Sequence, residues 1–338
     1  GKEQIEVKTL RAGEIGALPK LGATHTGNTL CAPGHKVEFV PIAFPAPVLT
    51  YALKSAGKGD EEKLSTALHR MMEEDRTLKF SHAAQTGDFL VGGMGQIHLE
   101  LVQARLKREF NIATTFEKPH VPYRETIRVA SKAQGRYKKQ TGGRGQYGDC
   151  WLEIKPNGQT EALAFESAIV GGAIPRGYIP AVEKGVQEAM HKGIVAGFPV
   201  IGVQAIVYDG SYHEVDSSEM AFKIAGSMAF KKAMEGARPV LLEPVVQLEI
   251  VVPSDYMGDV MGDINARRGK VLGMDSRGRN QVVRAEVPMS ESLTYAIDLR
   301  SMTSGQGYFT QQFSHYDEVP AHLSDKVVKE RQAQREQG

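Results

Sequence analysis

The chain has 338 residues, of which 41% are hydrophobic and 24% charged, and its formal net charge is only +1. This composition excludes disordered and fibrous proteins, and the length exceeds a single domain of about 100 to 200 residues. No apolar run approaches the roughly 20 residues of a membrane-spanning helix, and no secretory signal opens the sequence, so we expect a cytoplasmic protein with no membrane partner. The charge balance argues against a protein that coats RNA with a generally basic surface.

Residues 1–40 are rich in glycine, proline and threonine, and their apolar alternation is too short to build a core. We interpret them as the last strands of a β-rich domain. Pro41, Pro45 and Pro47 then mark a boundary, because proline holds itself and its predecessor in extended conformations. Cys31 and Cys150 are too few for a disulfide framework and are not spaced as a zinc site, so we expect two thiols and no metal.

Residues 41–120 are predicted to form a first α+β module. A strand at 48–53 precedes a helix that Asp60 can cap and whose apolar side chains repeat at helical spacing. Strands at 78–82 and 88–92, a second helix with Leu99, Val102 and Leu106 on one face, and a strand at 113–117 follow. The order βαββαβ is that of a ferredoxin-like fold.

The same order returns in residues 244–320, which we predict to be a second ferredoxin-like module. A strand at 246–252 leads into a helix that Gly269 closes, and this helix precedes strands at 271–275 and 281–288. A second helix over 290–303 and a strand at 307–316 complete the pattern. The sequence therefore predicts a multidomain α+β protein with two modules of one architecture.

Residues 121–243, between these modules, have a different order of predicted strands and helices. They contain predicted strands at 150–156 and 200–209, and a helix that Pro180 opens and Gly193 ends. A second helix is predicted from Ser218 to Gly236, with Met220, Ile224 and Met228 on one face. Residues 321–338 lack apolar periodicity, so we expect a solvated polar tail.

A cationic, glycine-rich segment lies in this middle region. Between Thr126 and Gly148 there is no acidic residue but six basic ones, namely Arg128, Lys132, Arg136, Lys138, Lys139 and Arg144. The run ends in a loop of Gln140, Thr141, Gly142, Gly143, Arg144, Gly145, Gln146, Tyr147 and Gly148. Glycine lets backbone amides approach a partner, arginine pairs with phosphate and tyrosine stacks on bases, which favours RNA binding. The alternative is an ordinary hairpin turn beside a solvated charged face.

Two further polar segments are candidate sites. In the turn over 208–218, a histidine beside two acids invites a catalytic or metal interpretation, but no second histidine or cysteine completes a ligand set. His213 is then a surface turn residue, unless Ser211 and His213 lie beside the glycine-rich loop. Arg267 and Arg268 end a helix, where the dipole favours cations, so either stability or RNA contact accounts for them.

Motifs for binding GTP are absent from the sequence. The phosphate-binding pattern G-x-x-x-x-G-K-[ST] does not occur, and its nearest approach, at Gly57, has Ala52 in place of the first glycine. The base-reading N-K-x-D is also missing, and the D-x-x-G at 255–258 falls inside a strand-to-helix junction. We therefore expect no enzyme activity and no cofactor in this chain alone.

Five long segments resemble elongation factor G: 93–101 (GMGQIHLEL), 141–148 (TGGRGQYG), 169–180, 209–231 and 256–273. The resemblance extends over about residues 20–320. It implies the end of a second domain, a β-barrel (1–40), a third domain (41–120), an elongated fourth domain like that of a small-subunit ribosomal protein (121–243), and a fifth domain (244–320). GTP and magnesium would belong to a domain outside this sequence.

The family also implies partners and site residues. The ribosome would be the partner, through the ribosomal RNA of both subunits, tRNA and mRNA, and we expect a monomer that promotes translocation. The tip of the fourth domain would comprise residues 140–148 with the turn containing His213, and Arg267 and Arg268 would face the large subunit. Asp149, where the family commonly has histidine, and Tyr137-Lys138-Lys139 before the loop suggest a paralogue.

Three other interpretations remain open. A ribosomal-protection relative would bind the same ribosomal site and remove a drug, although the sequence TGGRGQYG argues against it. An independent RNA-binding protein would bind isolated RNA as well as ribosomes. A metabolic enzyme would use the glycine-rich loop for phosphate and would turn over a nucleotide.

Overall fold

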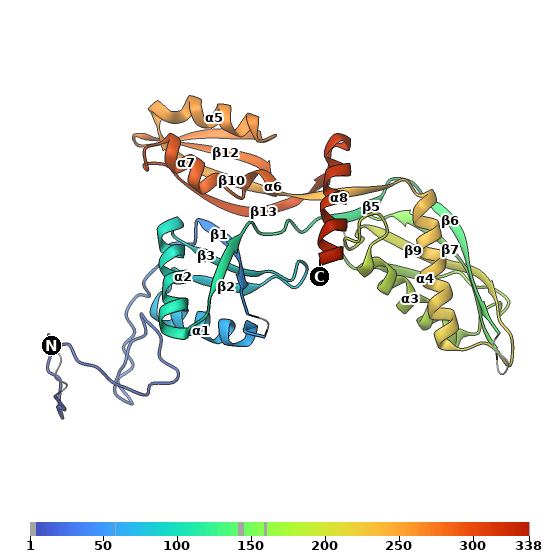
Figure 1. Ribbon diagram of the computed structural model, residues 1–338, viewed down its shortest axis with the longest axis horizontal. Helices are drawn as coiled ribbons and strands as arrows, with labels where there is room; N and C mark the ends of the chain where they lie inside the picture. The colour runs from blue at the N-terminus through green and yellow to red at the C-terminus, as the bar shows by residue number, and fades with distance from the viewer. Residues whose placement is uncertain (1–4, 58, 141–144, 159–160, 338) are drawn as a thin grey trace.

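The computed structural model describes residues 5–57, 59–140, 145–158 and 161–337, with side chains as far as residue 333. These residues form three antiparallel or mixed sheets with helices packed on them (Figure 1). Each sheet has its own hydrophobic core, so the predicted multidomain α+β fold class is confirmed. No helix in the described part of the chain is both long enough and apolar enough to cross a bilayer.

The first sheet has the predicted ferredoxin-like topology. Its elements are β1 (Leu49–Ser55), α1 (Glu61–Glu74), β2 (Lys79–His82), β3 (Phe89–Gly93), α2 (Gln96–Phe110) and β4 (Thr114–Glu117). The strand order is β2-β3-β1-β4. Leu64, Leu68 and Leu99 are fully buried between the helices and this sheet. Asp60 occupies the predicted cap position of α1, but its side chain bonds Lys63 instead of the helix amides.

The sheet near the carboxyl end repeats this topology. It contains β10 (Pro239–Pro253), α5 (Met257–Ala266), β11 (Lys270–Arg277), β12 (Asn280–Pro288), α6 (Met289–Ser292), α7 (Tyr295–Met302) and β13 (Tyr308–Glu318), in the strand order β11-β12-β10-β13. The single helix predicted over 290–303 is wrong, because a turn at 293–294 divides it into α6 and α7. The break separates Ser290, which contacts Arg268, from Tyr295, which is buried in the core.

The middle sheet has helices on one face only. It consists of β6 (Ser131–Lys139), β7 (Gln146–Pro156), β8 (Ala164–Ser167) and β9 (Val203–Ser211), in the order β6-β7-β9-β8 with β8 parallel to β9. The predicted helices are α3 (Ile179–Lys192), which ends at Gly193 with a positive φ, and α4 (Glu219–Gly236), whose first turn is capped by the Ser218 hydroxyl.

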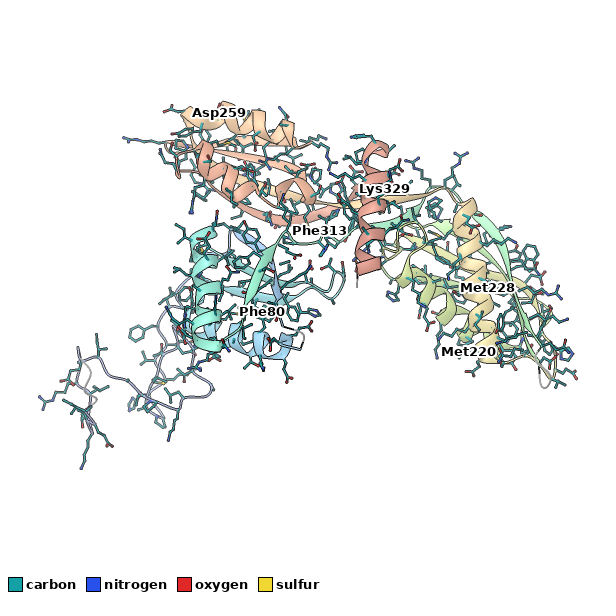
Figure 2. The ribbon with its side chains drawn as sticks, in the orientation of Figure 1. Phe80, Met220, Met228, Asp259, Phe313 and Lys329 are labelled. Carbon is teal, nitrogen blue, oxygen red and sulfur yellow. The ribbon has the colours of Figure 1, made fainter. Side chains whose placement is uncertain are left out.

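Helix α4 lies close to this sheet because small residues lie between their backbones, and Phe222 and Phe230 are buried beside them. A Cβ on Gly135 of β6 would lie 2.0 Å from the Ala225 carbonyl oxygen, so the helix and strand backbones are in close contact. Met220 and Met228, by contrast, are 57% and 43% exposed, and both lie on the outer side of the helix (Figure 2). The apolar face seen in the sequence is therefore the solvent side.

Strand β10 continues almost directly from α4, so no linker separates the middle sheet from the last one. It pairs over residues 239–242 with β5 (Arg124–Ile127), the fifth strand of the last sheet, and over 242–253 with β13 and β12. The predicted division at residue 243/244 falls inside this strand, where Glu243 is 3% exposed. The domain boundaries drawn from the sequence stay predictions.

Both ends of the chain differ from expectation. The expected strands of a β-barrel are wrong for residues 5–47, which have turns and bends but no strand among those described. Residues 321–337, predicted as a polar tail, form helix α8 (Ala321–Gln337). Val327 of this helix is 8% exposed and packs with Phe198 and Leu241, so a single apolar stripe holds an otherwise polar helix.

Candidate nucleic-acid interface

The glycine-rich segment lies at the free end of a long hairpin. Strands β6 and β7 pair in register as far as Lys139, opposite Gln146, at the end of the middle sheet remote from β10 (Figure 1). Four of the predicted RNA-binding residues, 141–144, lie outside the described residues. Gln140 and Gln146, which flank them, are exposed. The strands that flank the loop therefore form a hairpin, which fits both an ordinary turn and a loop that contacts RNA.

The turn containing His213 meets this hairpin end. The backbone N–H of Gly145 donates to Asp216 Oδ1 at 3.0 Å, and the N–H of Tyr147 donates to the Asp216 carbonyl oxygen at 2.8 Å. The Ser217 hydroxyl donates in turn to the Tyr147 carbonyl oxygen at 3.0 Å. These bonds join segments about 70 residues apart in sequence, so the two predicted parts of the tip lie side by side. Asp216 is the residue that connects them.

His213 presents a polar ring to solvent. Its side chain is 58% exposed, and its Nδ1 accepts from the backbone N–H groups of Val215 and Asp216, both at 3.3 Å. Because Nδ1 is an acceptor, the neutral ring carries its proton on Nε2, which is then a donor for an incoming oxygen. Among the described residues no group of three or more His, Cys, Asp or Glu side chains is placed to hold a metal ion.

Three of the predicted RNA-binding residues instead support the tip from inside. Tyr147 Oη donates to Ser211 Oγ at 2.7 Å, and Ser211 Oγ donates to Asp149 Oδ2 at 2.8 Å. Gln134 Nε2 completes this network on Asp149 Oδ1 at 2.8 Å, and Asp149 is 7% exposed. Gly148 is buried, and a Cβ there would lie 2.5 Å from a carbonyl oxygen of α4. Tyr147, Ser211 and Gly148 are thus positioned by packing and internal hydrogen bonds.

The cations of the run divide into paired and unpaired groups. Arg128 is ion-paired with Glu318, and Lys132 lies 3.8 Å from Glu153 with its ammonium over the Tyr208 ring. Arg136 is exposed with its guanidinium 5.7 Å from the Tyr147 ring centroid. Lys138 and Lys139 are exposed and have no ion-pair partner in the described part of the chain. Unneutralised positive charge is therefore concentrated at the end of the hairpin.

Arg267 and Arg268 are held in ion pairs within the last sheet. Arg267 bonds Asp263 and Asp298 at 2.7 and 2.8 Å, and its side chain is 15% exposed. Arg268 bonds Glu243 at 2.6 Å, and these hydrogen bonds raise the pKa of its guanidinium above the ordinary value. Arg268 rather than Gly269 adopts the left-handed conformation after the helix, with φ 60°. The geometry favours the stability interpretation over RNA contact for both arginines.

Two ferredoxin-like sheets beside a third sheet with a cationic hairpin place the chain among multidomain α+β proteins. The family model for elongation factor G domain III matches residues 44–118, that for domain IV matches 119–238, and that for the elongation factor G C-terminus matches 240–327. The chain belongs to the elongation factor G family.

A solved crystal structure of a protein from Thermus thermophilus is 48% identical to this chain, with a TM-score of 0.79. The match covers 89% of this chain and 45% of that one, so the chain spans less than half the length of this relative.

Proposed function

We propose that this chain is the ribosome-binding part of a translational GTPase, and that its tip contacts RNA while tRNA and mRNA move through the ribosome. The family matches support a role like that of a translation elongation factor. The observation that carries the finer proposal is the meeting of the hairpin end with the turn containing His213, through Asp216. Two surface elements that offer a cation, a ring N–H and exposed glutamines to one region suit phosphate and base-edge contacts.

The chemistry proposed for the tip is steric and electrostatic. Lys138 and Lys139 would neutralise phosphates, and Gln140, Gln146 and His213 would donate to RNA oxygens. No bond is made or broken by these groups. GTP and Mg²⁺ would be bound by a domain outside this sequence, and hydrolysis there would be coupled to movement of the tip. The protein would act as a monomer in the cytoplasm.

The test is a triple variant with a composition-matched control. In a full-length factor that contains this chain, Arg144, Gln146 and His213 are all changed to alanine. The control changes Lys329, Gln332 and His322, which are exposed on α8, to alanine. Translocation is followed by the rate of tRNA movement on purified ribosomes, and ribosome binding is measured for this chain alone.

The tip variant is expected to slow tRNA movement by at least about tenfold, because each lost charge-assisted contact contributes about 1.5 to 3 kcal/mol. The control is expected to move tRNA at the unmodified rate. An unchanged rate in the tip variant, with the fold intact, would refute the tip assignment. Rescue of translation from a ribosome-directed drug, without tRNA movement, would favour a ribosomal-protection factor instead.

A further inference from the structure

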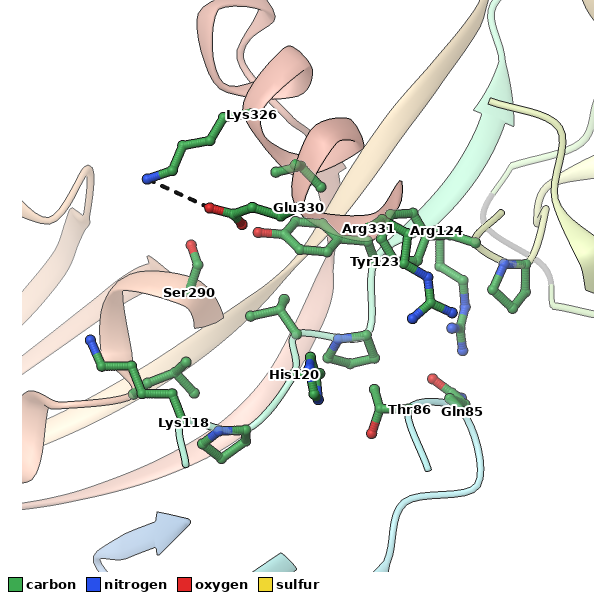
Figure 3. A pocket seen from close by; sticks show the side chains of 17 residues that line it. Gln85, Thr86, Lys118, His120, Tyr123, Arg124, Ser290, Lys326, Glu330 and Arg331 are labelled. Carbon is green, nitrogen blue, oxygen red and sulfur yellow. Dashed lines mark ion pairs between the residues drawn. The ribbon is translucent and has the colours of Figure 1, made fainter. Parts of the chain in front are cut away.

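A cavity of about 420 Å³ lies where the parts of the molecule converge (Figure 3), and the elements that line it lie away from the hairpin tip (Figure 1). Its walls come from the loop between β2 and β3, the connection that leads into β5, the segment around Phe198, the turn after β12, and α8. The side chains that project into it are mostly polar or cationic. Those used below are Thr86, Lys118, Arg124, Ser290, Lys326 and Arg331.

Arg124 is the unusual residue of this cavity. Its side chain is 4% exposed, and only Nη2 has a partner, Glu161 Oε1 at 3.0 Å. Nε and Nη1 are buried and have no hydrogen-bond partner among the described residues. The guanidinium also lies 5.5 Å from the Tyr316 ring centroid, which satisfies none of its N–H groups. Buried N–H groups of a charged side chain are costly when unpaired, so this arrangement favours an added acceptor beside Arg124.

Most of the charged side chains that line the cavity with Arg124 are positive. Lys118, Lys326 and Arg331 line it, whereas Glu330 is the one acidic residue among its described lining residues. Glu330 lies 3.9 Å from Lys326, so it is directed at a lysine on its own helix (Figure 3). The side chains of Arg124 and Arg331 extend into the cavity from neighbouring elements (Figure 3). Two guanidinium groups at one cavity favour an anion as its occupant.

We propose that this cavity binds a small phosphate-bearing anion, with Arg124 as its principal ligand. Nη1 and the second N–H of Nη2 form the fork that pairs with two oxygens of one phosphate, and Nε–H points to a different side of the guanidinium. Lys118 at the exposed rim would compensate the second negative charge, and the hydroxyls of Thr86 and Ser290 can donate to the remaining oxygens. The phosphate group is what the site recognises, whether free or carried by a nucleotide. This site is separate from the tip and does not depend on the function proposed for it.

The proposal is tested by calorimetric titration of the chain with inorganic phosphate, and separately with a nucleoside monophosphate and its phosphate-free nucleoside, in chloride buffer of matched ionic strength. Two variants perturb the site: R124M removes the buried fork, and K118E reverses a charge at the exposed rim, where the fold does not depend on it. R108Q, an exposed arginine of α2 far from the cavity, is the matched control. Circular dichroism confirms that each variant is folded.

The unmodified chain and R108Q are expected to bind phosphate with one saturable site. K118E and R124M are expected to bind at least about tenfold more weakly, because one charge-assisted hydrogen bond contributes that much. Equal binding of phosphate and the monophosphate identifies the free group as sufficient, and tighter binding of the monophosphate identifies a nucleotide. No saturable binding by either ligand, unchanged affinity in the folded K118E variant, or equal binding of the phosphate-free nucleoside would overturn the proposal.

Discussion

Glu125 organises the turn that connects α3 to the middle sheet. This residue of β5 is 0% exposed, and its carboxylate accepts hydrogen bonds from five consecutive backbone N–H groups, residues 194–198. The N–H groups of Ala196, Gly197 and Phe198 donate to Oε1 at 2.8, 2.9 and 3.1 Å, and those bonds are buried. The backbone of this turn therefore depends on one side chain about 70 residues away in sequence.

Changing Glu125 to alanine leaves these donors without an acceptor. Three buried orphan N–H groups at about 1 to 3 kcal/mol each would cost roughly 3 to 9 kcal/mol if the turn could not relax. Partial hydration of the turn lowers this, so we expect a loss of about 4 kcal/mol in the free energy of unfolding. E125Q retains one acceptor oxygen but places an NH₂ group against two donors, so we expect its free energy of unfolding to fall by about 2 kcal/mol.

The assay is urea unfolding followed by the fluorescence of Trp151, the only tryptophan of the sequence, which lies in β7 of the middle sheet. Because the molecule contains three sheets, the transition seen by this probe is compared among variants rather than interpreted as global unfolding. E125A is expected to unfold at clearly lower urea than E125Q, and E125Q at lower urea than the unmodified chain. A midpoint for E125A within error of the unmodified chain would refute the reasoning.

Three further outcomes follow from packing and charge. G135A should lower the free energy of unfolding by about 2 kcal/mol or more, because its Cβ would lie 2.0 Å from the α4 backbone. G258A, whose Cβ would have no atom within 4 Å, should leave the free energy of unfolding unchanged, and urea midpoints compare the two variants. R268Q should lower the free energy of thermal unfolding by about 2 kcal/mol, because its partner Glu243 is 4% exposed and would be left without its ion pair. Ribosome affinity should stay unchanged, and weaker affinity would support RNA contact by Arg268. Burial raises the pKa of Cys150 to about 12, so a thiol reagent at pH 8 should modify the exposed Cys31 alone. The contribution of the neutral Cys150 thiol to the free energy of unfolding should persist below pH 9.0 and fall as the pH rises toward 12.

The fold was largely predictable because apolar residues repeat at strand spacing and at helical spacing in the same order as the observed elements. The ferredoxin-like modules follow from alternation in strands and helical spacing between them. Helix α4 shows the limit of this signal: its buried face combines alanines with Phe222 and Phe230, whereas Met220 and Met228, which also repeat at helical spacing, are exposed. Helix α8 was missed because one buried valine holds it.

The site was predictable only in part, for a physical reason. Composition identifies a cationic loop, but the hydrogen bond from Gly145 to Asp216 joins residues separated by 71 positions, and no local pattern specifies that contact. The inward roles of Ser211 and Gly148 likewise arise from packing against neighbouring strands and α4. An acid at position 149 in an otherwise basic region was a usable signal for the buried network that supports the tip.

The central claim is that unpaired cations at the hairpin end neutralise RNA phosphates. The most direct test is the salt dependence of ribosome binding by this chain and by its K138A/K139A variant, with K107A/K329A, two exposed lysines on α2 and α8, as the control. The slope of log affinity against log salt concentration is predicted to become shallower by about 1.4 to 1.8 in the tip variant, because each neutralised phosphate contributes about 0.7 to 0.9. The control should keep the unmodified slope. Equal slopes for the tip variant and the unmodified chain would contradict the account.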